Sequence, residues 1–268
     1  MPMRKFQAVA DGLAARAGAR VEAPAPIEIE ALRRVHTDAY LDAVRSGEPR
    51  ALAESQKFPW SPALWPSVLL TSGGALAAAS RALEDGVAAA LASGFHHAHA
   101  DHGEGFCTFN GLVVAAEALR AAGRVQRVAV LDLDLHYGND YWQNKPHRDV
   151  ENVRHRDGPN HVSFALPNGS GRAALEVALE RGMAAILAFG RPDLLLYQAG
   201  ADPYREDPYS PLDLDHDDLR ERDRSVFAWA KREGLPVAWV LAGGYTPDLA
   251  KVVEVHLGTF DAAASTYC

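Results

Sequence analysis

The sequence VQRVAVLDLDLH, residues 125–136, begins as an apolar run and ends in two aspartates and a histidine at alternate positions. Such an apolar run is typical of a strand that is buried on both faces of a parallel sheet. We therefore expect a strand from Val125 to Leu135. Its last residues carry polar groups that a buried strand otherwise avoids.

Short apolar runs alternate with Ala-rich amphipathic stretches in the rest of the chain, as in βα units. The other expected strands are Val87–Ala92, Leu194–Tyr197 and Val237–Leu241. The expected helices are Gly74–Glu84, Phe109–Ala122, Arg172–Ala188, Asp215–Glu233 and Pro247–Leu257. This order predicts an α/β fold with a central, mostly parallel sheet. Since no linker or repeat divides the 268 residues, we expect one domain over residues 1–268.

Two stretches interrupt this pattern. Residues Tyr137–Ser170 are polar and rich in His, Asn, Gly and Pro, which predicts a long functional loop or an irregular insertion. The longest uncharged run, Phe58–Ser80, contains Pro59, Pro62, Pro66 and Gly73-Gly74, which are expected to break a membrane-spanning helix early. We interpret this run as a loop that enters a helix.

The composition narrows the class of protein. A net charge of −8 and the lack of a Lys/Arg stripe argue against direct binding to nucleic acid. The two cysteines, Cys107 and Cys268, suggest no disulfide framework and fit a reducing compartment. No stretch has the length and apolar character of a membrane span, so we expect a soluble, cytoplasmic protein with no membrane partner.

Asp132, Asp134 and His136 would share one face of the expected strand, because residues two apart in a strand point the same way. Two buried carboxylates beside an imidazole require a compensating cation. The plainer alternative is a helix N-cap with a solvated aspartate at the end of the strand.

Asp202 follows the apolar run Leu194–Tyr197. Alone, it is best explained as the turn residue before Pro203. Together with Asp134 and His136 it supplies one histidine and two carboxylates, a set that leaves a zinc or ferrous ion with open positions for water and substrate.

His96 and His97 follow another apolar run and a glycine. Two neighbouring imidazoles can divide general base and general acid work between them. Asp132 is then available to orient one of them, and Asn139 the other. The alternative is a pair of exposed loop histidines without a catalytic role.

Tyr245 follows Gly243-Gly244, glycines that allow the backbone to approach a site closely. A phenol there can donate a hydrogen bond to a developing oxyanion. The motif is weak evidence by itself, because Gly-Gly serves many turns.

Taken in order, these motifs resemble the histone deacetylase family, which includes bacterial deacetylases and acetylpolyamine amidohydrolases. The resemblance extends from about Pro2 to Leu257, and details at Val35–Leu41, Asn139 and Arg220–Asp223 look closest to class IV-like bacterial members. The matching residues are His96-His97-Ala98, Gly105-Phe106-Cys107 with Asn110, Asp132-x-Asp134-x-His136 with Gly138, Gln198-x-Gly200-Ala201-Asp202 and Gly243-Gly244-Tyr245.

The resemblance implies a three-layer α/β/α fold of the arginase/deacetylase type. It implies that Asp134, His136 and Asp202 bind Zn²⁺, with Fe²⁺ as the alternative ion. It further implies that His96 and His97 are the acid/base pair and that Tyr245 polarises the acyl carbonyl. Gly105 and Phe106 would line a tunnel for the acyl chain.

The implied reaction is zinc-dependent hydrolysis of an N-acyl amide. The first expected substrate is an acylated lysine in a peptide or protein. An acylated small amine such as an acetylpolyamine, or a long-chain acyl amide, is the alternative. The oligomeric state is left open.

Three departures from the family pattern limit what can be carried over. The match begins near Pro2-Met3, so a usual first strand is expected to be missing. Asn139 stands where many members have an aspartate, which removes a charge that would raise the pKa of an imidazole. Val153 stands where relatives often have a serine for K⁺, which leaves a structural K⁺ site in question.

Two other functions would leave a different pattern in the sequence. A binuclear manganese ureohydrolase would need a second aspartate near Asp202 and an Asp-Ala-His-x-Asp run, which Asp202-Pro203 and His136-Tyr137-Gly138 do not match. A catalytically silent protein that binds an acylated ligand would usually show a replaced metal ligand or tyrosine. Neither replacement is present here.

Overall fold

One parallel sheet organises the molecule in the computed structural model, which describes residues 3–16, 19–138, 150–152 and 162–268. Its described strands lie in the order β1-β5-β4-β2-β3, and each neighbouring pair is parallel. They are β1 (Val87–Ala90), β2 (Val128–Asp132), β3 (Val150–Asn152), β4 (Leu194–Ala199) and β5 (Val237–Leu241). The register pairs Asp132 with Gln198 and Ala199 with Leu241, so the carboxyl ends of β2, β4 and β5 meet at one edge.

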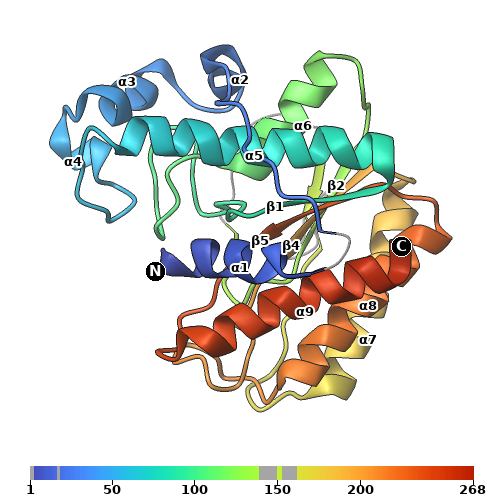
Figure 1. Cartoon of the computed structure of the whole chain (residues 1–268). Coiled ribbons are helices and arrows are strands. Elements are labelled where there is room, and N and C mark those ends of the chain that lie inside the picture. Colours follow the sequence, from blue (N-terminus) through green and yellow to red (C-terminus); the bar gives the residue numbers. More distant parts are fainter. Residues whose placement is uncertain (1–2, 17–18, 139–149, 153–161) are drawn as a thin grey trace.

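Helices cover both faces of this sheet (Figure 1). One face carries α5 (Leu64–Asp85) and α6 (Gly111–Ala121), and the other carries α7 (Arg172–Phe189), α8 (His216–Arg232) and α9 (Leu249–Tyr267). Alternate strand residues enter opposite cores: Val130 and Leu196 pack against α5 and α6, while Leu131 and Leu195 pack against α7 and α8. β2 and β4 are therefore buried against apolar cores on both faces, which confirms the three-layer α/β fold.

The other described helices, α1 to α4, extend the two outer layers. Tyr40, Phe109 and Val113 belong to one core in which α2 (Ile29–Arg33), α3 (Asp38–Ser46) and α4 (Arg50–Ala53) lie beside α5 and α6. On the opposite side, α1 (Arg4–Ala14) packs along α9 through Val9 and Leu13 (Figure 1). No helix in the described ranges is long and apolar enough to cross a membrane.

The expected strand Val125–Leu135 is wrong at its end, because β2 stops at Asp132. The amide of Asp134 donates to Asp132 Oδ1 at 3.0 Å, and the amide of His136 donates to Asp134 Oδ1 at 2.9 Å. A side-chain oxygen that accepts from the amide two residues later forms a local turn and takes the backbone out of the ladder. The alternation of aspartates thus reflects two successive turns and not one face of a strand.

The run Phe58–Ser80 does enter a helix from a loop, but the expected start at Gly74 is wrong, because α5 runs unbroken from Leu64 to Asp85. Pro66 lies in the first turn, where a backbone N–H has no partner within the helix and its loss is tolerated. Gly73 permits close packing, since a Cβ there would lie 2.0 Å from the carbonyl oxygen of Ala25. A further difference is β3, which falls inside the stretch expected to be irregular.

Candidate active site at the carboxyl ends of the strands

The candidate ligands lie just beyond the ends of two neighbouring strands. Asp134 and His136 follow β2, and Asp202 follows β4. His136 Nδ1 lies 2.8 Å from Asp202 Oδ2 and 3.3 Å from Asp134 Oδ1. One ligand-type atom from each of the three residues lies within 4.8 Å of the other two. The structure therefore brings together the three residues that the sequence picks out as a metal site.

The electrostatics of this cluster call for a cation. Asp134 and Asp202 are 2% and 0% exposed, and burial together with the charge of Asp134 raises the pKa of Asp202 to about 6. Hydrogen bonds to Asp134 and Asp202 raise the pKa of His136 to about 10. Without a metal, the imidazolium of His136 is thus the cation that offsets the two carboxylates. A divalent ion fits the same nitrogen and oxygen donors.

Each carboxylate also accepts a hydrogen bond from a backbone amide, through the oxygen that does not contact His136. Gly243 N donates to Asp134 Oδ2 at 2.7 Å, and Leu135 N donates to Asp202 Oδ1 at 3.1 Å. A Cβ at position 243 would lie 2.0 Å from Asp202 Oδ2, so the first glycine of the Gly-Gly pair is required by the ligand itself. Gly243 thus holds Asp134 by its amide and leaves room for Asp202, two residues before the tyrosine.

His96 and His97 lie next to this cluster. His96 Nδ1 is 2.7 Å from Asp132 Oδ2, and its Nε2 is 3.1 Å from Nε2 of His97. Burial disfavours the charged form of His96, but the negative charges of Asp132 and then Asp134 outweigh it and raise the pKa of His96. The ring centroids of His97 and His136 are 6.1 Å apart. The two histidines are therefore a coupled pair beside the candidate metal ligands, and Asp132 holds the ring of His96 through Nδ1.

Tyr245 packs edge-to-face against the imidazole of His136. Its ring centroid is 5.7 Å from that of His136, with the planes at 84°. Burial, followed by the charges of Asp134 and Asp202, raises the pKa of the Tyr245 phenol far above its usual value. The phenol stays protonated at all physiological pH values and can act as a hydrogen-bond donor.

A family model described as the histone deacetylase domain matches residues 1–145 and 143–260. The chain belongs to the histone deacetylase family. It is 30% identical over 247 residues to an uncharacterized protein of Picosynechococcus sp., covering 88% of this chain and 82% of that protein. It is 27% identical to histone deacetylase 2 of Arabidopsis thaliana over 68% of this chain, which spans half of that protein. The crystal structure of acetylpolyamine aminohydrolase from Burkholderia pseudomallei superposes with a TM-score of 0.80 at 25% identity, covering 99% of this chain and 92% of that one.

Gly105 and Phe106, which family resemblance places in an acyl tunnel, lie beside the histidine pair. Both have positive φ angles, +52° and +67°, and a Cβ at position 105 would lie 2.5 Å from Cδ2 of His97. The Phe106 ring packs against Phe58 with centroids 5.3 Å apart. Asn139, expected to orient one of the two histidines, lies outside the described residues, as does Val153, the residue that puts a K⁺ site in question.

Three further residues contact the site of this histone deacetylase family member. The sequence motifs predict none of them. Asp207 accepts a hydrogen bond from Tyr245 N at 2.6 Å, and Tyr209 places its ring 5.2 Å from that of Tyr245. Lys5 of α1 is fully buried and donates to the carbonyl oxygens of Ala242 and Gly243. Burial lowers the pKa of Lys5 to about 8, against the opposing charge of Asp202. The polar turn after Asp202 was a usable signal for Asp207, whereas nothing in α1 marks Lys5.

A buried ion pair between Arg222 and Asp223 holds the loops that follow β2 and β4. Arg222 donates to the carbonyl oxygens of Gly200 at 2.7 Å and of Leu133 at 3.4 Å, and it pairs with Asp223 at 2.8 Å. Asp223 also accepts hydrogen bonds from Tyr197 and Thr259. Because Leu133 and Gly200 each lie within two residues of a candidate metal ligand, this network fixes the loops that carry Asp134 and Asp202.

Proposed function

We propose that this protein is a zinc-dependent amidohydrolase that removes an acyl group from an amine, with acyl-lysine in a peptide or protein as its first substrate class. Membership of the histone deacetylase family supports hydrolysis of acylated amides. The observation that carries the proposal is the convergence of Asp134, His136 and Asp202 beside His96-His97 and Tyr245.

The donor set supports a catalytic ion in preference to a structural one. Two carboxylates and one imidazole leave coordination positions for other ligands, whereas structural zinc sites are usually closed by four protein ligands. A zinc ion held by these residues would supply Lewis acidity toward the acyl carbonyl and would lower the pKa of water. Ferrous iron is the alternative ion for the same ligands.

The histidine pair supplies the proton transfers. Its two Nε2 atoms are 3.1 Å apart, so the pair can share one proton. The neutral member accepts a proton from the attacking water, and the protonated member donates one to the nitrogen of the leaving amine. Asp132 keeps His96 oriented through Nδ1, so that Nε2 faces His97 and the reacting groups.

Tyr245 stabilises the carbonyl oxygen as it gains negative charge. The ring contact with His136 and the raised pKa, which keeps the phenol protonated, support this role as a hydrogen-bond donor. A donor aimed at charge that develops in the transition state raises kcat and does little for substrate binding. Gly105, Phe106 and the exposed ring of Tyr209 would then border the path of the acyl amine.

The proposal is tested by a hydrolysis screen of zinc-loaded protein. Acetyl-lysine and longer acyl-lysine peptides are compared with acetylpolyamines, and the metal content of each preparation is measured in parallel. Faster turnover of acyl-lysine peptides supports the proposal. Turnover of acetylpolyamines alone would move the substrate to the small-amine class that the similar Burkholderia structure names. Metal-loaded protein that is inert toward every amide would refute the enzymatic function.

A further inference from the structure

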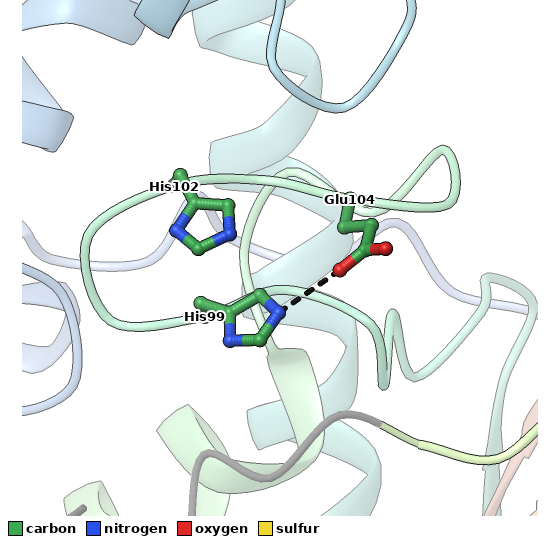
Figure 2. A group of neighbouring side chains, drawn as sticks. All are labelled: His99, His102 and Glu104. Atoms are coloured by element: carbon green, nitrogen blue, oxygen red, sulfur yellow. Dashed lines mark hydrogen bonds and ion pairs between the residues drawn. The ribbon is translucent and has the colours of Figure 1, made fainter.

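A second group of ligand-type side chains lies on the loop between the histidine pair and Gly105-Phe106. His99, His102 and Glu104 each place one ligand-type atom within 4.8 Å of the other two. His99 Nε2 is 3.0 Å from Glu104 Oε2, and the rings of His99 and His102 stack with centroids 4.2 Å apart. Figure 2 shows the two rings one above the other, with Glu104 reaching toward them from the returning arm of the loop.

Hydrogen bonds hold the loop around this group in place before any ligand binds. The amide of His99 donates to the carbonyl oxygen of His102 at 2.9 Å, which closes the loop at its base. The carbonyl of Ala100 accepts from Thr37 N at 2.8 Å, and Gly103 N donates to Ser55 Oγ at 2.8 Å. Both arms are thus attached to other parts of the fold, so little conformational entropy remains to be lost when a ligand bridges them.

One of the imidazoles is already oriented as a metal ligand would be. Nδ1 of His102 lies 2.7 Å from Asp101 Oδ1, and this contact lowers the pKa of Asp101. Histidines that bind metals usually donate one ring N–H to a carboxylate or carbonyl, which leaves the other nitrogen with its lone pair for the ion. With Nδ1 so engaged, Nε2 of His102 is the nitrogen that can bind.

We propose that His99, His102 and Glu104 bind one divalent ion of the zinc class, separate from the candidate catalytic ion. Two imidazoles and a carboxylate suit Zn²⁺, and the remaining coordination position would hold water. The ring planes are 11° apart, so one ring must tilt before both lone pairs meet at one ion. Side-chain exposures of 25% for His99 and 43% for His102 leave room for that rotation.

Such an ion would join the two arms of the loop that ends at Gly105-Phe106. His99 lies two residues after His97, and Glu104 directly precedes Gly105, which contacts the His97 ring. Binding would therefore stiffen the loop beside the candidate site without using any residue of the acid/base pair or of the first metal cluster.

The test is calorimetric titration of Zn²⁺ into the zinc-loaded protein, with total zinc per chain measured after removal of free metal. The wild-type protein is expected to take up a second equivalent. His102→Ala and Glu104→Gln should each lose it, while Asp101→Asn, which removes only the orienting carboxylate, should weaken it by about 10–100-fold. Zn²⁺ should also raise the Tm of the wild-type holoprotein, and this increase should be absent in His102→Ala.

His216→Ala is the matched control, because His216 is a partly exposed histidine near a glutamate, Glu254, on another part of the surface. It should retain the second equivalent. The proposal is overturned if wild-type protein binds a single zinc ion, or if His102→Ala and Glu104→Gln, folded by circular dichroism, bind the second ion as tightly as wild type. Loss of the second ion in His216→Ala alone would place the site elsewhere and would equally overturn the assignment.

Discussion

The amide nitrogen of Tyr245 donates a hydrogen bond of 2.6 Å to Oδ2 of Asp207, a buried carboxylate five residues after the ligand Asp202. The same carboxylate accepts through Oδ1 from the amide of Tyr209 at 3.1 Å. Asp207 therefore links the loop that carries the tyrosine to the loop that carries a metal ligand, and it fixes where the phenol lies relative to the metal cluster.

Replacing Asp207 by Ala is expected to lower kcat with little loss of zinc, because the amide of Tyr245 loses its acceptor while the three ligands stay. Asp207→Asn keeps an oxygen that can accept from Tyr245 N and should restore most of the activity. Steady-state kinetics and metal content of the two variants check this. Equal activity in wild type and Asp207→Ala would show that the contact does not position Tyr245.

Tyr245→Phe removes the phenol hydroxyl without changing the ring. Loss of one oxyanion donor typically costs about 10²–10³ in turnover, and the loss should appear in kcat more than in KM because the interaction strengthens as charge develops. Zinc content and binding of a hydroxamate, which chelates through open metal positions, should change less. Wild-type turnover of an acyl-lysine peptide by this variant would place Tyr245 outside the reaction.

Asp134→Ala, His136→Ala and Asp202→Ala should each lose bound metal and activity together, because each variant removes one of only three proposed protein ligands. Metal analysis after dialysis and amide hydrolysis are measured side by side. Asp213→Ala, which changes an exposed aspartate near the surface Arg205, serves as the control and should keep its zinc. Full zinc occupancy in any of the three variants would remove that residue from the ligand set.

The pH dependence of metal-free protein follows from His136, whose pKa is raised from 6.5 to about 10. A raised pKa in the folded state stabilises the protein below pH 6.5, and this stabilisation is lost as the pH rises through 10. Metal-free protein should therefore become less stable toward denaturant between pH 6.5 and 10, whereas zinc-loaded protein should not show this loss. Metal-free His136→Asn should lack this loss of stability between pH 6.5 and 10, because it has no imidazole to titrate.

Zinc uptake should release about one proton per chain near pH 8, because the ion replaces the proton on His136. Calorimetry in two buffers with different ionisation enthalpies measures this number. Proton release close to zero would mean that His136 is neutral before the metal binds, and would contradict the bridging imidazolium.

Asp223→Ala tests the buried support beneath the loops. It leaves the guanidinium of Arg222 buried without its carboxylate, which typically lowers the free energy of unfolding by about 3–5 kcal/mol. The double variant Arg222→Met/Asp223→Leu replaces the pair by apolar groups and should be less destabilised than Asp223→Ala. Denaturant unfolding of both variants measures this order, and the reverse order would show that the charge of Arg222 is tolerated alone.

β1, β2, β4, β5 and the candidate metal cluster could be predicted because apolar runs mark these strands and polar residues follow the ends of β2 and β4. Val237–Leu241 is an apolar run of strand length and is found as β5. The convergence of Asp134, His136 and Asp202 follows from the meeting of strand ends in a parallel sheet. The reason given for the alternation at Asp132–His136 was nevertheless wrong, since consecutive turns produce it.

The unpredicted parts of the site depend on contacts between distant segments. Lys5 reaches carbonyl groups 237 and 238 residues later in the chain, and no local pattern distinguishes it from a surface lysine of an amphipathic helix. From the sequence, Gly73 is expected to interrupt a helix. Its role in close packing against the carbonyl of Ala25 could not be predicted, because the position of that carbonyl depends on the fold. The roles of Asn139 and Val153 stay predictions.

The contact of Lys5 with the end of β5 also bears on how the protein is made. During translation, α1 leaves the ribosome long before Ala242 and Gly243 have been synthesised, and α9, the helix along which α1 packs, follows later still. The apolar face of α1, with Val9 and Leu13, therefore stays unpacked until β5 and α9 have been synthesised. The Gly-Gly loop can receive the buried ammonium group of Lys5 only after Ala242 and Gly243 have been synthesised, so the candidate site should be assembled late during translation.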